Sequence, residues 1–190
     1  MKLRERIHWY TGVLLLILGV YACGGLLWAV IRPKYQATIT DADGALELGA
    51  AINVEFAGFM WFVILTTALA LILTDCILAN RSWLRRWLGG TNPELIGVVP
   101  FLWVGLCMWL GALAFVAFGE VATVVIFNIP TQESDFLPGE VITYVPRLDA
   151  GPTGYLMAPF ASFLYYWTAI LVEPRSTTPT AAPAVTEAKS

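Results

Sequence analysis

The chain has 190 residues, of which 58% are hydrophobic, and its mean hydropathy is +0.70. This apolar content predicts a single integral membrane domain with short loops, and it excludes a separate soluble catalytic domain. The formal net charge of −3 is small, so the distribution of charge along the sequence is more informative than its sum.

Four long apolar stretches are predicted to be membrane-spanning helices. They cover residues 11–31, 56–79, 95–118 and 153–172. Each has about 20 residues or more, which at about 1.5 Å per residue crosses a hydrocarbon core of about 30 Å. A surface helix of a soluble protein shows a polar face, whereas these stretches are apolar all round. The predicted fold class is an all-α membrane protein, a four-transmembrane-helix bundle within residues 1–172.

Positive charge is unevenly distributed between the two sides of the predicted bundle. Most of the 11 lysines and arginines lie before span one, between spans two and three, or after span four. The positive-inside rule then places both termini in the cytoplasm of a multi-pass plasma-membrane protein. The outer loops, residues 32–55 and 119–152, carry most of the acidic groups. An acidic outer face disfavours nucleic acid or anionic lipid as an outer partner.

The two outer loops are predicted to contribute strands to one small sheet. Residues 35–40 alternate apolar and polar side chains, Asp41–Gly44 is typical of a turn, and residues 45–48 can return as a second strand. The second loop holds another strand candidate at 140–145. Three strands over an apolar surface can be stable where a lone hairpin is marginal. We therefore predict an extracytoplasmic β-hairpin or sheet that caps the bundle.

Two segments on the cytoplasmic side lie outside the predicted helices. Between spans two and three, two tryptophans four residues apart share a helix face, and neighbouring arginines can reach lipid phosphates. These predicted headgroup anchors are Arg81, Trp83, Arg85, Arg86 and Trp87. The tail, residues 173–190, is rich in Thr, Pro and Ala without apolar periodicity, so it is predicted to be disordered.

Two carboxylates at the outer ends of spans two and three, Glu55 and Glu120, are the candidate functional residues. Ionisable groups at membrane depth are costly and therefore mark candidate sites. Antiparallel packing of the two spans could bring them together as a pair that shares a proton or binds a cation. Alternatively, each is solvated at the interface or bonded to loop backbone or to Arg147. Asp75, nearer the inner edge, is predicted to form a structural ion pair with Arg81.

The sequence offers no recognisable catalytic, cofactor or metal motif. His8 is the only histidine, which excludes multi-histidine haem or zinc ligation within the chain. The turn Asp41-x-Asp43-Gly44 lacks the third oxygen ligand and the later glutamate of a calcium loop. Ser162 has no base available in its span. We predict a protein that is not an enzyme and that binds no cofactor or metal.

Aromatic and small residues indicate a surface that docks on another membrane protein. Glycines let helix backbones approach closely, within the protein or against a partner. The fourth span carries more aromatic side chains than four spans can bury among themselves, although lipid contact also accounts for them. The candidate interface residues are Trp28, Trp61, Tyr144, Tyr155, Tyr165, Tyr166 and Trp167.

The layout of the chain is similar to that of a known family. Residues Leu27–Pro33 end span one before the hairpin-like loop, and Gly139–Pro146 leads to Gly151–Tyr155 and Ala158-Pro159 at the head of span four. This layout resembles an actinobacterial family of four-span membrane proteins of unknown function, over about residues 10–172. It also resembles the small uncharacterised subunit associated with the corynebacterial cytochrome bc1–aa3 respiratory supercomplex. The family contributes no catalytic residues.

The residues and the resemblance together lead to one functional hypothesis and two alternatives. The hypothesis is a non-catalytic accessory or assembly subunit on a larger membrane complex, which the resemblance identifies as the respiratory supercomplex. One alternative is a small oligomeric transporter or cation pathway that uses Glu55 and Glu120. The other is a partner in cell-envelope biogenesis that faces cell-wall lipids.

Overall fold

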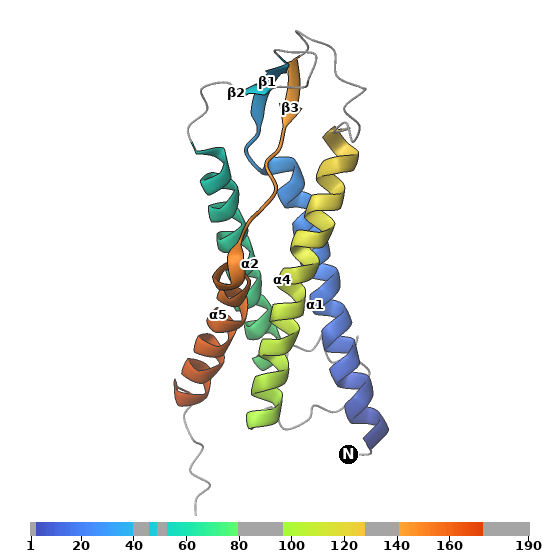
Figure 1. The fold of residues 1–190 in the computed structure, drawn as a ribbon. Helices are drawn as coiled ribbons and strands as arrows, with labels where there is room; N and C mark the ends of the chain where they lie inside the picture. The colour runs from blue at the N-terminus through green and yellow to red at the C-terminus, as the bar shows by residue number, and fades with distance from the viewer. Residues whose placement is uncertain (1–2, 40–45, 49–52, 80–96, 128–140, 173–190) are drawn as a thin grey trace, which may run out of the picture.

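The computed structural model describes residues 3–39, 46–48, 53–79, 97–127 and 141–172. Four helices in this part of the chain are long and apolar enough to cross a membrane, as predicted (Figure 1). They are α1 (Leu3–Ile31), α2 (Val54–Leu78), α4 (Val98–Phe127) and α5 (Gly151–Val172). Their outward side chains are mostly large and apolar, which is the surface that hydrocarbon requires.

Helix α4 is longer than the sequence predicted. We expected span three to end at Phe118 because Glu120 follows it, yet the helix continues to Phe127. Two features explain the difference. The charge of Glu120 is paired with that of Arg32 at 2.9 Å, and residues 121–127 contain no glycine or proline that would end the helix. A carboxylate inside the helix therefore does not end it.

Helix α1 packs in parallel with α4 and α2 packs in parallel with α5, and α5 also packs against α4. Tyr21 of α1 contacts Met108, and Arg32, further along, contacts Glu120, so α1 and α4 run in the same direction. Figure 1 shows each pair side by side. This pairing was not predicted, because apolar periodicity does not say which spans are neighbours.

The close crossing of α1 and α4 depends on two glycines. A Cβ atom at Gly25 would overlap the backbone carbonyl of Phe115, and one at Gly119 would lie 2.6 Å from the Trp28 indole. Because neither glycine has a side chain, the backbones approach and the Trp28 and Phe115 rings fill the core, with centroids 5.7 Å apart. This crossing brings together the ends of the two helices nearer the β sheet.

Three strands pair at the end of the bundle opposite the N-terminus (Figure 1). The central strand, β1 (Tyr35–Ile39), lies between β2 (Leu46–Leu48) and β3 (Val141–Tyr144), and both pairings are antiparallel. The three predicted strand segments therefore do join in one sheet. The backbone N–H of Val54 donates to the Tyr35 hydroxyl at 3.3 Å, which ties the sheet to the start of α2.

Gly25→Ala is expected to destabilise the bundle, because the added methyl group meets backbone that cannot move aside. Overpacking of this kind costs about 1–3 kcal/mol, and we expect a loss of that size in the free energy of unfolding measured by SDS titration in mixed micelles. Gly19→Ala is the matched control, because no heavy atom lies within 4 Å of its Cβ position. Equal stability of the two variants would contradict the α1–α4 crossing.

Candidate functional site

A buried ion pair joins α1 and α4 at their ends nearer the β sheet. Arg32, the residue after α1, is only 3% exposed, and its Nη1 donates to Oε1 of Glu120 at 2.9 Å. The Glu120 side chain is 29% exposed. A charge buried alone at this depth would cost several kcal/mol, so each group depends on the other for its place in the structure.

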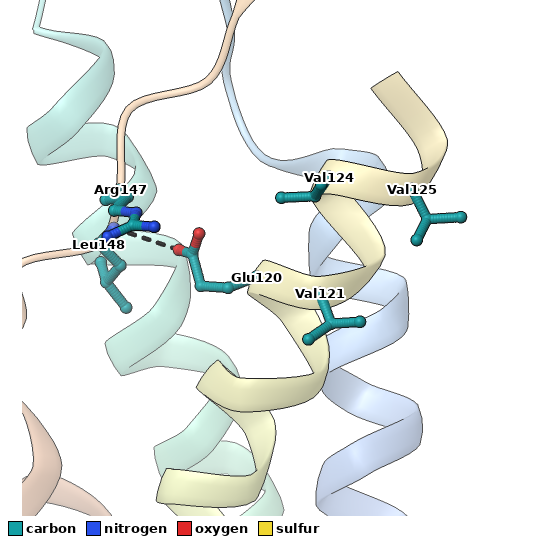
Figure 2. A pocket seen from close by; sticks show the side chains of 6 residues that line it. All are labelled: Glu120, Val121, Val124, Val125, Arg147 and Leu148. Carbon is teal, nitrogen blue, oxygen red and sulfur yellow. Dashed lines mark hydrogen bonds between the residues drawn. The ribbon is translucent and has the colours of Figure 1, made fainter. Parts of the chain in front are cut away.

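The segment that leads from β3 to α5, residues 145–150, supplies backbone groups to both charges; we call it the connector. Nη2 of Arg32 donates a hydrogen bond to the carbonyl oxygen of Pro146. The backbone N–H of Leu148 donates to Oε1 of Glu120 at 3.2 Å (Figure 2). Non-helical backbone inside a membrane bundle is tolerated only where protein groups satisfy it. The ion pair does so here, and this positions the start of α5.

Trp28 completes the environment of the arginine. The guanidinium carbon of Arg32 lies 4.2 Å from the centroid of the Trp28 ring, which is the geometry of a cation–π interaction. The two residues are four apart, so the helix places them on one face. We call the set Trp28, Arg32, Glu120, Pro146 and Leu148 the Arg32 clamp.

A groove of about 450 Å³ opens beside the clamp, between α4 and the connector (Figure 2). It is lined by Glu120, Val121, Val124, Val125, Arg147 and Leu148. The three valines are 64%, 45% and 74% exposed, and Arg147 is exposed as well. The groove therefore combines a rigid apolar wall with one carboxylate and one guanidinium group.

The two predicted carboxylates have different environments. Glu120 is bonded to loop backbone, as one alternative proposed, but its charged partner is Arg32 and not Arg147. Glu55 is exposed on the first turn of α2, where it lines a narrow crevice together with Arg32. Within the described ranges, no group of three or more His, Cys, Asp and Glu side chains could hold a metal ion.

Polar contacts also join α2 and α5, near the end of the bundle where the N-terminus lies. The Tyr165 hydroxyl donates to Oδ1 of Asp75 at 2.7 Å, and the hydroxyl oxygens of Thr74 and Ser162 lie 2.7 Å apart in a buried hydrogen bond. Ser162 thus packs against α2. The predicted pairing of Asp75 with Arg81 involves a residue outside the described ranges.

The predicted interface role is wrong for two residues. Trp28 and Tyr166 are 0% and 1% exposed, so they belong to the core of the protein and cannot contact a partner. Trp28 is buried because Gly119 leaves space for its ring, and Tyr166 packs edge-on against Phe101 with ring centroids 5.4 Å apart. A boundary aromatic residue has the same sequence pattern whether it faces lipid or a glycine.

The other predicted residues are distributed over several surfaces. Trp61 and Trp167 are 44% and 60% exposed, whereas Tyr155 and Tyr165 are half-buried. Tyr144 lies in β3 opposite Tyr35 of β1. The headgroup anchors Arg81, Trp83, Arg85, Arg86 and Trp87, and the tail at 173–190, lie outside the described residues.

Arg32 is the functional residue that sequence reasoning missed. We interpreted Arg32-Pro33 as the end of span one, because a residue before proline disfavours helix. An arginine at one span end and a glutamate at the same end of another span could have indicated an ion pair. The missing information was that α1 and α4 are neighbours.

Comparison with protein-family models, with curated proteins and with solved structures found no match for this chain. The function of the site is therefore argued from its own geometry.

Glu120→Gln is expected to destabilise the protein, because it leaves the Arg32 charge buried without a counter-charge. Removing one partner of a buried pair costs about 3–5 kcal/mol, and the 29% exposure of Glu120 places the expected loss near the lower value. The free energy of unfolding in mixed micelles measures it.

Glu55→Gln is the matched control, since it removes the same charge from an exposed position. Adding Arg32→Met to Glu120→Gln should restore part of the lost stability, because the uncompensated charge is then gone. If Glu120→Gln and Glu55→Gln were equally stable, the clamp would not hold the fold.

Proposed function

We propose that this protein is a non-catalytic accessory or assembly subunit that docks on a larger membrane complex. The observation that carries the proposal is the groove beside the Arg32 clamp. It is concave, largely apolar and edged by two charged groups, which are the features of a surface that orients a partner as well as holding it.

The shape of the groove is fixed before any partner arrives. The valines on its α4 wall are β-branched and stiff, so they lose little side-chain freedom on contact. The clamp ties the opposite wall, the connector, to α1 and α4. Both hydrogen bonds to Glu120 use Oε1, so Oε2 can accept a bond from a partner's hydroxyl or basic group. Arg147 offers the opposite charge nearby.

The depth of the groove in the membrane favours a protein partner over lipid. We place the clamp at the boundary of the hydrocarbon layer, because α1 ends there, at Ile31, and the chain then enters the β sheet. Val124 and Val125 lie beyond Glu120 on α4, toward the headgroup layer. Exposed apolar side chains are poorly matched to headgroups and water, and such patches typically mark interaction sites.

The partner that we propose is the respiratory bc1–aa3 supercomplex, and the resemblance of the sequence is its support. The positive-inside rule supports a plasma-membrane orientation with both termini cytoplasmic and the β sheet outside. In that orientation the groove faces partner segments at the outer boundary. The exposed Trp61 and Trp167 supply further apolar area on other sides of the bundle.

The clamp disfavours an oligomeric cation pathway through Glu55 and Glu120. The Glu120 carboxylate is already paired with Arg32, and an arginine beside a conduit raises the electrostatic barrier to cations. A role in cell-envelope biogenesis would use the same groove with another partner. The identity of the proteins that co-purify separates this role from the respiratory one.

Isolation of the tagged protein in mild detergent tests the proposed partner. We expect bc1 and oxidase subunits in the eluate by mass spectrometry, together with haem absorbance bands. Recovery of the protein alone, without haem, would contradict the respiratory assignment.

Val125→Arg is expected to abolish this association, because it places a charge in the apolar wall of the groove. Val98→Arg is the matched control, since Val98 lies on the same helix and is 73% exposed against 74% for Val125. Quantitative mass spectrometry of the two eluates should show partner subunits reduced at least about tenfold for Val125→Arg only, equivalent to about 1.4 kcal/mol. Equal recovery from both variants would show that the partner binds elsewhere.

A further inference from the structure

A second groove, of about 310 Å³, lies at the opposite end of the α1–α4 pair from the clamp. Its lining is Ile7, Tyr10, Thr11 and Leu14 of α1 with Val99 and Trp103 of α4. The α1 residues recur at intervals of three and four, so they form one continuous face of the helix. The groove is a narrow apolar channel that runs along α1.

Aromatic rings indicate the depth of this second groove in the membrane. Tyr10 and Trp103 meet edge to face with ring centroids 5.7 Å apart. Amphipathic rings of this kind favour the boundary between headgroups and hydrocarbon. The Trp103 indole N–H is buried and finds no acceptor in the described part of the chain. The groove therefore begins at the headgroup layer and continues inward, as a lipid acyl chain does.

Two exposed arginines flank the headgroup end of the groove. Arg4 lies three residues before Ile7, and Arg6 lies four residues before Tyr10. Residues three or four apart are neighbours on a helix surface, so Arg4 borders Ile7 and Arg6 borders Tyr10, on the two sides of the apolar lining. Their long side chains can converge on an anion placed between them.

We propose that the second groove binds an anionic phospholipid of the leaflet in which α1 begins. One acyl chain lies along Ile7, Thr11 and Leu14, and the phosphate lies between Arg4 and Arg6. The apolar lining selects an acyl chain over a free phosphate ion, and the two guanidinium groups select an anionic headgroup over a zwitterionic one. This site is independent of the proposed docking partner, because it lies at the other end of the bundle.

Native mass spectrometry of the full-length protein, titrated in mild detergent with phosphatidylglycerol or with phosphatidylcholine of the same acyl chains, tests the proposal. The wild-type protein should bind phosphatidylglycerol about 25-fold tighter than phosphatidylcholine. The combined change Arg4→Gln and Arg6→Gln should weaken phosphatidylglycerol binding by about 25-fold, the effect of two basic residues near an anionic lipid surface. Phosphatidylcholine binding should stay the same.

Two further variants separate charge from shape. Lys34→Gln removes a positive charge from the opposite end of the bundle, outside both grooves, and should leave the lipid preference intact. Thr11→Phe fills the groove without changing charge and should weaken the binding of both lipids. Equal binding of the two lipids by the wild-type protein, or an unchanged preference after the Arg4 and Arg6 changes, would overturn the proposal. Binding of a polypeptide in this groove, with no preference between the two lipids, would also overturn the proposal.

Discussion

The buried ion pair between Arg32 and Glu120 is the interaction on which the half of the molecule nearer the β sheet depends. In a medium of low dielectric constant neither charge is stable alone, so the burial of either residue requires contact with the other. Their hydrogen bonds to Pro146 and Leu148 bring in a third segment, which is distant from both in sequence. One interaction thus fixes the end of α1, the continuation of α4 and the start of α5.

The ion pair in turn depends on a steric condition lower in the bundle. Gly25 and Gly119 allow α1 and α4 to cross closely, and at that separation the Arg32 side chain reaches Glu120 while stacking on Trp28. The same crossing leaves grooves at the two ends of the helix pair. Their chemistry differs because one end carries a paired charge beside valines, while the other carries exposed arginines beside aromatic rings.

The helices and strands could be predicted from the sequence because their signals are local. Apolar length predicts a span, and alternation predicts the strands of β1 and β3. The clamp could not be predicted, because it depends on which helices are neighbours. For the same reason the sequence did not predict the length of α4 or the burial of Trp28 and Tyr166. A charged residue within a helix is tolerated when an opposite charge faces it, and an aromatic residue near the membrane boundary is buried when another helix faces it. Glu120 was identified as a candidate, but its partner was not.

The central claim is that the groove beside the clamp receives another membrane protein. A photo-reactive amino acid placed at Val124 and activated in cells tests it most directly, with Leu102 as the reference position because it is 55% exposed and lies near the start of α4, at the other end of the helix. The account predicts that Val124 cross-links to a distinct membrane polypeptide, whereas Leu102 cross-links to lipid. Cross-linking to lipid alone from both positions would contradict it.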